Sequence, residues 1–361
     1  MKNGIYVYGV IKTSPPCREA GREAGDPKEP ARHSLWHQAL AGGFGEIGIG
    51  DKSRRHVGTN VFTIGFKDLA AVVSNSPFIV YDSLTKEKTV KDLVTHQLVI
   101  EKIMAGFTII PVKFGTMVET EDEVIKLMEK GYFVLRNALG KMEGKIELDL
   151  VAIWKLPKIL SVIYDHNHRV QKKQQEIALK GDKVVVEDKV ALGKLIEQAL
   201  NTRKARDSRL ILQALKKKAV EICLHDLTSD EMVFNAAFLI KASDKEIFYK
   251  ALDKLDQRFE DTLNFRLVGP LPPYSFSTIL FKRISQQEVE KAKKTLGLNG
   301  EITDKLLSHA YRQLALECHP DKNAGQDQLN FDLVNSAYRV LKDFARGGFF
   351  NVDIYHWEEQ R

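Results

Sequence analysis

The sequence predicts an α+β protein, with two α+β domains followed by a small all-α module that contains a helical hairpin. Short runs rich in β-branched and aromatic residues, which are typical of strands, alternate with helical patterns up to Arg283. After Arg283 these strand signals stop, and two apolar helical faces flank a turn that contains proline. We therefore expect four parts, at residues 1–144, 145–283, 284–350 and 351–361, of which the last is a tail.

The composition is that of a globular protein, with 43% hydrophobic and 28% charged residues. The cysteines Cys17, Cys223 and Cys318 are far apart and form no CxxC pair, which argues against a disulfide framework and against a cysteine zinc site. No apolar stretch approaches the ~20 residues that cross a bilayer. The apolar run near the N terminus is also too short for a secretory signal. We expect a cytoplasmic protein that does not bind membranes.

The first domain is expected to contain a sheet and two helices. IYVYGVI at 5–11 predicts the first strand, and a stretch rich in Pro, Gly and charge at 13–55 predicts a long loop. The remaining patterns predict strands at 60–66, 69–76 and 108–117, and helices at 86–105 and from Thr120 to about 139.

The second domain is expected to be ferredoxin-like with a long helical insertion. The patterns predict strands at 145–154, 231–242 and 264–273, helices over 158–225, and a helix at 244–259. This β-(long α)-β-α-β order is typical of a ferredoxin-like domain with an antiparallel sheet.

Two patterns in the 13–55 loop have the spacing of ligand sites, and we favour a plain loop for both. Gly43, Gly45 and Gly48 form GxGxxG without a strand before it or a helix after it. His33 and His37 have metal-ligand spacing but no third ligand. Because no catalytic motif stands out elsewhere, we expect no enzymatic activity, no cofactor and no metal. A nucleotide-dependent switch in the Gly-rich loop is the alternative from another class.

The predicted helices over 169–220 are strongly basic. They carry 14 Lys and Arg against 6 Asp and Glu, a net charge of +8 in a chain whose total is +6. The stretch has no aromatic residue on which bases could stack, and its apolar residues recur at helical intervals. We favour a solvated helix face over a nucleic-acid surface, and an acidic protein partner is the alternative.

Several motifs over residues 4–283 resemble the GvpL/GvpF family of gas vesicle proteins. They are IYVYGVI, LAAVVSNSP, the histidine His96 in VTHQLVIEKIM, TIIPVKFGTMVETEDEV and VGPLPPYSF. The most specific parts are PVKFGTM, with Pro111, Phe114, Gly115 and Thr116, and GPLPPYSF, with Gly269, Pro270, Pro272, Pro273 and Tyr274. Prolines cannot lie inside a central strand, and Gly115 offers a turn, so we expect both motifs to be structural.

The resemblance implies a gas vesicle location and an accessory role in gas vesicle assembly. Members of this family are minor vesicle components thought to hold the hydrophobic shell subunit GvpA and to keep it from aggregating. Other gas vesicle accessory proteins are further implied partners. A subunit with exposed apolar strands and helices needs such a holder before assembly.

The sequence of the C-terminal module predicts one apolar helix face before HPDKN and a second one after it. The first face consists of Ile302, Leu306, Leu307, Ala310, Tyr311, Leu314, Ala315 and Cys318, and the second of Phe331, Val334, Ala337, Tyr338 and Leu341. A shorter helix, QQEVEKAKKTLGL, precedes them. Cys318 is expected to face the small core.

Leu296–Gly297, AYRQLALECHPDKN and FDLVNSAYRVLKD resemble a J-domain, the module by which DnaJ-type cochaperones engage a DnaK-type chaperone. The resemblance implies that His319, Pro320 and Asp321 trigger ATP hydrolysis in that partner by docking. Tyr311, Arg312 and Lys305 are the further docking residues that we expect on the second helix.

The second helix is less basic than is usual for J-domains. Ser308, Gln313 and Glu317 stand where basic residues are common, which would slow steered encounter with an acidic chaperone surface. We expect an active J-domain in a non-enzymatic assembly factor. The alternatives are a purely structural vesicle component with an inactive J-domain, and a general J-domain cochaperone with other clients.

Overall fold

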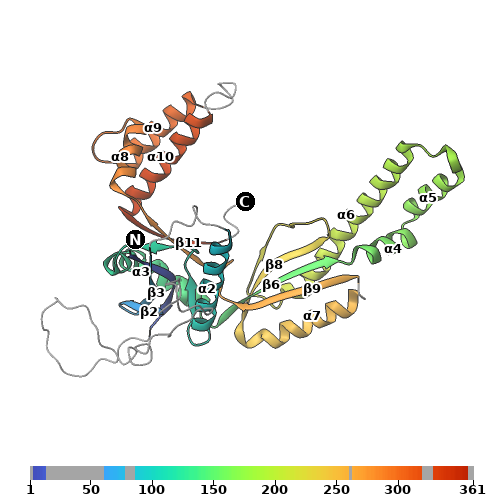
Figure 1. The fold of residues 1–361 in the computed structure, drawn as a ribbon, viewed down its shortest axis with the longest axis horizontal. Coiled ribbons are helices and arrows are strands. Elements are labelled where there is room, and N and C mark those ends of the chain that lie inside the picture. The colour runs from blue at the N-terminus through green and yellow to red at the C-terminus, as the bar shows by residue number, and fades with distance from the viewer. Residues whose placement is uncertain (1–2, 14–60, 78–85, 260–261, 319–327, 357–361) are drawn as a thin grey trace. The chain divides into compact units, whose positions relative to one another are not determined.

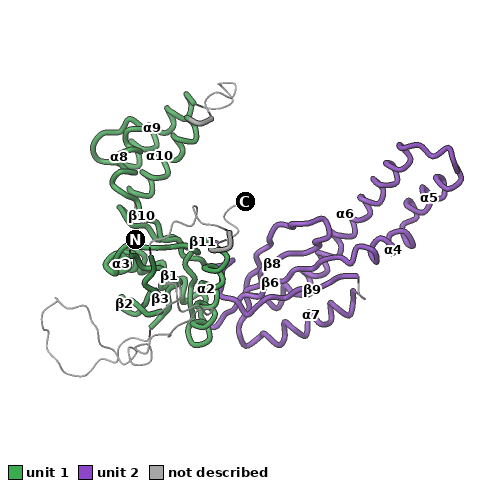
Figure 2. Tube along the Cα trace, in the orientation of Figure 1, with its two compact units in different colours: residues 1–143, 277–355 green, residues 144–276, 356–361 purple. Residues whose placement is uncertain are grey.

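The structure is a computed structural model, and it describes residues 3–13, 61–77, 86–259, 262–318 and 328–356 (Figure 1). The chain divides into two units, shown in Figure 2. Unit 1 consists of residues 1–143 and 277–355, and unit 2 of residues 144–276 and 356–361. No helix in these described ranges combines the length and the apolarity that crossing a membrane requires.

Unit 1 contains an antiparallel sheet whose central strand is buried on both faces. The strands are β1 (Asn3–Lys12), β2 (Val61–Phe66), β3 (Leu69–Pro77), β4 (Ile109–Pro111) and β5 (Met117–Val118). They run in the order β2-β3-β1-β4, and β5 also pairs with β1. The eight inner residues of β1 are all buried, because α2 (Lys86–Met104) and α3 (Glu121–Met142) both pack against the sheet.

Local sequence explains where α3 begins and which face it buries. The side chain of Thr120 accepts a hydrogen bond from the Glu123 amide, and three acidic residues in the first turn favour the positive end of the helix dipole. Its apolar face then enters a core with Val7, Val73 and Ile110. These strands and helices confirm the α+β fold expected for the N-terminal part.

Two strands from the far end of the chain complete unit 1. Strand β10 (Thr278–Arg283) pairs antiparallel with β11 (Phe350–Tyr355) over six residue pairs. β10 adjoins β4, where the Lys113 amide donates to the Ile279 carbonyl at 2.9 Å. β11 lies on α3 and adds Val352 to the core of unit 1.

The hairpin β10–β11 corrects two expectations from the sequence. The chain after Arg283 is not all helical, because Phe350–Tyr355 is a strand and not a tail. The boundary after the ferredoxin-like part falls at 276/277 and not at 283, because β10 bonds to β11 and to Lys113 of unit 1. Its pairing partner is about seventy residues away in sequence, too far for a local pattern to reveal.

Between these two strands the chain forms the three predicted helices. They are α8 (Gln286–Leu296), α9 (Asp304–Glu317) and α10 (Gln328–Gly347). Their common core is small and made of Ile284, Val289, Ala292, Leu296, Leu307, Val334, Ala337 and Leu341. The helical module is therefore an insertion in a β-hairpin, attached to unit 1 at both ends.

Gly131 offers a test of the contact between β11 and α3. A β-carbon at Gly131 would lie 2.7–2.9 Å from the side chain of Val352, whereas one at Gly140 of the same helix would meet nothing. Gly to Ala in a helix interior gains up to about 1 kcal/mol of helix propensity. We expect Gly140→Ala to raise the thermal unfolding midpoint and Gly131→Ala to lower it. Equal shifts in the same direction would contradict the packing of β11 on α3.

Unit 2 is a ferredoxin-like domain with a long helical insertion, as the sequence predicts. Its antiparallel strands are β6 (Lys145–Trp154), β7 (Glu221–Leu224), β8 (Met232–Lys241) and β9 (Leu263–Leu271), in the order β7-β8-β6-β9. The helices are α4 (Leu156–His166), α5 (His168–Lys180), α6 (Val186–Lys216) and α7 (Lys245–Phe259). Two 3₁₀ turns lie at Gly181–Lys183 and Ala242–Asp244.

The helical insertion of unit 2 leaves the sheet as an arm. Figure 1 shows α4, α5 and the first half of α6 extending beyond the strands, while α7 lies along the sheet. The end of α6 returns to the core with Ile211 and Leu215, both fully buried. Strand β7 comes next in the chain after α6. The sequence predicts helix there and not a strand, because these four residues continue a charged helical stretch.

Candidate functional site

The inserted helices have well-defined local ends. Ser285 and Glu288 form a capping box at the start of α8, and Gly297 ends the helix in the left-handed conformation at φ +65°. Thr303 caps α9 by accepting from the Leu306 amide. The predicted apolar faces are confirmed for Leu307, Val334 and Leu341, but Leu306 is 53% exposed and not part of the core.

The predicted docking residues on α9 fall into two different environments. Lys305 and Arg312 are exposed, and their side chains form no hydrogen bond or ion pair with other described residues. Tyr311 is half-buried, stacks on Tyr338 with ring centroids 4.3 Å apart, and donates a hydrogen bond to Asn335 at 2.6 Å. Tyr311 thus joins α9 to α10, and its part in docking remains a prediction.

His319, Pro320 and Asp321 lie outside the described residues. The last described residue before them is Cys318, half-buried at the end of α9, where its amide donates to the Leu314 carbonyl at 3.0 Å. The next is Gln328 at the start of α10. The three residues therefore belong to the connection between the two antiparallel helices of the hairpin.

The PVKFGTM motif is the end of a buried hydrogen-bonded chain in unit 1. The Gly115 amide donates to the Tyr6 hydroxyl at 3.1 Å, and this hydroxyl lies 3.0 Å from Nδ1 of His96. Phe114 packs edge-on against the His96 ring at 5.6 Å between centroids. Burial lowers the pKa of His96 to about 4, so its ring is neutral at pH 7 and Nδ1 can accept a hydrogen bond from the Tyr6 hydroxyl.

The other PVKFGTM residues shape the turn around this chain. Pro111 is the last residue of β4 and pairs with Gly9 of β1. Gly115 has a φ of +83°, and the Thr116 hydroxyl donates to the Lys113 carbonyl at 2.6 Å. The motif joins β1, α2 and β4, which supports a structural role.

The GPLPPYSF motif terminates the edge strand β9. Gly269 has a φ of +137°, and a β-carbon there would lie 2.8 Å from the Glu147 carbonyl oxygen, so only glycine fits. Pro270 lies near the end of β9, which is the last strand in the sheet order β7-β8-β6-β9. A proline, which has no amide proton to donate, is tolerated in such an edge strand. The carbonyls of Pro272 and Pro273 accept from Tyr274 and Phe276, which closes the turn.

A buried acid on β6, Glu147, holds this turn beside the half-buried Asp149, and none of the sequence motifs includes either residue. Glu147 is 1% exposed and accepts hydrogen bonds from the Ser275 amide and hydroxyl, both at 2.9 Å. The Ser275 hydroxyl also lies 3.3 Å from Nε2 of His225. Burial and then the charge of Asp149 raise the pKa of Glu147 to about 8. The signal in the sequence is two acids, two positions apart, inside the otherwise apolar KIELDLVAIW.

The raised pKa of Glu147 predicts how stability depends on pH. The unfolded side chain releases its proton near pH 4.5 and the folded one near 8, so this stabilisation is complete below pH 4.5 and is lost as the pH rises through about 8. The loss is at most about 1.4 kcal/mol per pH unit. Glu147→Gln resembles the protonated acid, and we expect it to flatten the decline of thermal stability between pH 5 and 8, with exposed Glu246→Gln as the control. An unchanged slope in Glu147→Gln would show that another group causes the decline.

The remaining candidates from the sequence do not join a site in the structure. Gly43, Gly45, Gly48, His33 and His37 lie outside the described residues. In the ranges that the structure describes, no three His, Cys, Asp or Glu side chains are grouped as a metal site would require. The basic 169–220 stretch forms α5 and α6 of the arm.

The three-helix module has the sequence HPD between its second and third helices and is attached to an α+β body. This combination defines a J-domain protein. The comparisons specify both parts. Residues 4–278 match the family model of the gas vesicle synthesis protein GvpL/GvpF, and residues 294–346 match the DnaJ domain. The chain therefore belongs to the GvpL/GvpF family and carries a DnaJ domain.

Individual relatives agree with this assignment. Gas vesicle protein F of Nostoc sp. is 29% identical over 52% of this chain and 78% of its own length. Gas vesicle protein F of Streptomyces sp. is 27% identical over 75% of this chain and 98% of its own length. The DnaJ homolog subfamily C member 7 homolog of Schizosaccharomyces pombe is 45% identical over 16% of this chain and 14% of its own length.

Solved structures share the fold. The match to the crystal structure of GvpF from Anabaena sp. covers 76% of this chain and 97% of the GvpF chain, with a TM-score of 0.56 and 22% identity. The match to the crystal structure of GvpF from Microcystis aeruginosa covers 75% of this chain and 98% of the GvpF chain, with a TM-score of 0.51 and 22% identity. Neither family model that matches the chain describes an enzyme.

Proposed function

We propose that this protein is a non-enzymatic accessory factor of gas vesicle assembly and a minor vesicle component. It binds the hydrophobic shell subunit GvpA, prevents its aggregation, and recruits a DnaK-type chaperone through the inserted J-domain. The observation that carries the proposal is the position of the DnaJ domain, which lies between strands β10 and β11 of unit 1. A client held by that body is then tethered to the same chain as the chaperone-recruiting helices.

Exposed apolar side chains on α2 support the holding role. Val90, Leu93, Val94 and Leu98 recur at helical intervals and are 52%, 45%, 39% and 37% exposed. A contiguous apolar strip of this kind is suited to bind a protein with its own apolar surface. We place the shell subunit on this strip.

A matched pair of double variants tests where the client binds. Leu93→Gln/Leu98→Gln changes the α2 strip, and Leu179→Gln/Val186→Gln changes two other exposed apolar residues, in unit 2. We follow light scattering of purified GvpA as it is diluted from denaturant in the presence of each chain. The α2 variant should lose most of the suppression of aggregation and the control should keep it. If the wild-type chain itself leaves aggregation unchanged, GvpA holding is refuted.

A second candidate is a structural vesicle component whose J-domain is inactive. The weakly basic surface of α9 favours this alternative, because only Lys305 and Arg312 supply full positive charges on this helix. Electrostatic steering by two charges is modest at physiological salt. Stimulation of chaperone ATP hydrolysis separates the two candidates.

A further inference from the structure

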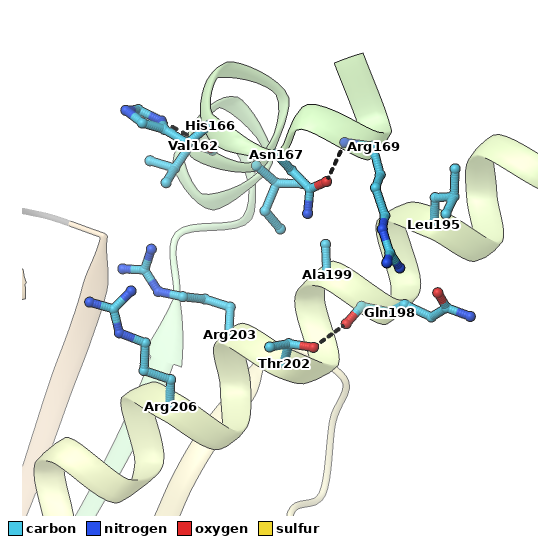
Figure 3. A pocket seen from close by; sticks show the side chains of 11 residues that line it. Val162, His166, Asn167, Arg169, Leu195, Gln198, Ala199, Thr202, Arg203 and Arg206 are labelled. Atoms are coloured by element: carbon cyan, nitrogen blue, oxygen red, sulfur yellow. Dashed lines mark hydrogen bonds between the residues drawn. The ribbon is translucent and has the colours of Figure 1, made fainter. Parts of the chain in front are cut away.

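The arm of unit 2 has a hollow between α4, α5 and α6, shown in Figure 3. Its volume is about 330 Å³. Three arginines, Arg169, Arg203 and Arg206, line it together with His166, and no carboxylate side chain is among the lining residues. Figure 3 shows Arg169 reaching toward α6 from the start of α5, and Arg203 and Arg206 projecting from α6.

Two of the three arginines are not neutralised by the surrounding protein, and the third, Arg203, is paired with Asp207. Arg169 and Arg206 are exposed, and within the described part of the chain their guanidinium groups take part in no hydrogen bond or ion pair. Arg203 and Arg206 are three positions apart on one helix, where like charges repel. Bringing a third arginine from another helix to the same hollow adds to this repulsion, and a bound anion would relieve it.

A buried acid holds one arginine in place. Asp207 is 1% exposed, accepts from Nε of Arg203 at 2.8 and 2.9 Å, and accepts from the Trp154 indole at 3.3 Å. These bonds use only Nε of Arg203, so its two terminal nitrogens remain for a ligand. A side chain that is already fixed loses little entropy on binding, which favours a site over a mobile surface charge.

The lining of the hollow between the charged side chains is apolar. Val162, Ile163, Leu195 and Ala199 line it from α4 and α6. A second hollow of about 440 Å³ shares Val162 and Arg203 with the first and is lined by Arg258 as well. The two hollows therefore adjoin at Val162 and Arg203, and each combines apolar with basic lining residues.

We infer that this surface binds an acidic segment of a partner protein, with carboxylates on Arg169, Arg203 and Arg206 and an aliphatic side chain between them. Arginine matches carboxylates in a two-pronged geometry, and the apolar lining fits Leu, Ile or Val. Nucleic acid is the weaker fit. A nucleic acid has no aliphatic group comparable to the side chain of Leu, Ile or Val. Residues 169–220 also contain no aromatic residue on which a base could stack. The inference goes beyond GvpA holding and chaperone recruitment, because it concerns unit 2 alone.

The test uses the full-length chain and three fluorescent probes at physiological salt. The probes are a short helical peptide of Glu and Leu, the same peptide with Ser in place of Leu, and a single-stranded RNA of similar length. The wild-type chain should bind the Glu/Leu peptide, and the Ser peptide and the RNA at least about tenfold more weakly. Equal or tighter binding of the RNA would overturn the inference in favour of a nucleic-acid surface.

Matched variants separate the site from the general positive field. Arg169→Gln/Arg206→Gln removes two charges from the hollow, and Lys194→Gln/Arg209→Gln removes two exposed charges on α6 that do not line it. We expect the first to weaken peptide binding at least about tenfold and the second less than about twofold. Equal losses, or no peptide binding by the wild-type chain, would overturn the proposed site. Thermal unfolding of both variants checks that each remains folded.

Discussion

A chain with glutamine in place of His319 is expected to lose its stimulation of ATP hydrolysis by a DnaK-type chaperone. In the J-domain resemblance His319, Pro320 and Asp321 are the residues that trigger the partner, and they stand between the two helices of the hairpin. We expect the steady-state rate of stimulated ATP hydrolysis to fall at least about tenfold, which corresponds to about 1.4 kcal/mol in the activation free energy. Fold and client binding should remain, because none of the core residues of the module changes.

Two controls make this result decisive. His168→Gln replaces an exposed histidine of α5 in unit 2 and should leave stimulation unchanged. Lys305→Gln and Arg312→Gln should each lower stimulation in part, and more strongly at low salt, because exposed charges act mainly on encounter. If the wild-type chain gives no stimulation at all, the inactive J-domain is the correct alternative, and the recruiting role is refuted.

A chain that ends after Phe349 is expected to be far less stable in unit 1. The truncation removes β11 and with it Val352, Phe350 and Ile354, which pack into the core around α3 and Ile279. Full burial of such side chains contributes about 1.5–3 kcal/mol each, and two of the three are only partly buried. A loss of about 4 kcal/mol is a large part of ordinary domain stability and should lower the unfolding midpoint by about 10 °C.

The matched variant removes the J-domain and keeps β11. The Ile284 amide donates to the Phe349 carbonyl at 2.9 Å, and Arg283 pairs with Phe350, so the ends of the insertion are adjacent. Replacing residues 286–347 by a short Gly/Asn turn should therefore close a hairpin and retain unit 1 with nearly its full stability. Differential scanning calorimetry distinguishes the two chains. A replacement variant that is as unstable as the truncation would contradict the insertion of the J-domain in the hairpin.

The sequence predicts most of unit 1 and of the sheet in unit 2, because these elements have clear local periodicity. Strands such as IYVYGVI and helices such as Glu121–Met142 bury residues at the spacings that the fold requires. Strand β7 escapes this reasoning because four residues are too few for a pattern. Strand β11 escapes it because its stability comes from β10 and α3, which are remote in sequence.

The site residues show the same division. Gly115 is identified as a turn residue from its motif, and the structure confirms its positive φ. The close approach that demands glycine at Gly269 is seen only in the structure. The partners of those motifs, His96 and Glu147, are found only when distant strands and helices come together. The hollow of the arm could not be predicted at all, because its three arginines come from two helices whose packing angle the sequence does not reveal.

We propose that this chain holds GvpA on its GvpL/GvpF body and passes it to a chaperone through its J-domain. The most direct measurement mixes the chain, labelled GvpA, a DnaK-type chaperone and ATP, and follows which protein carries the label. We predict that the label moves to the chaperone with the wild-type chain, and stays on the chain with His319→Gln and with the variant in which a turn replaces 286–347. Transfer that proceeds equally with all three chains would refute chaperone recruitment by the J-domain, and a label that never binds the chain would refute GvpA holding.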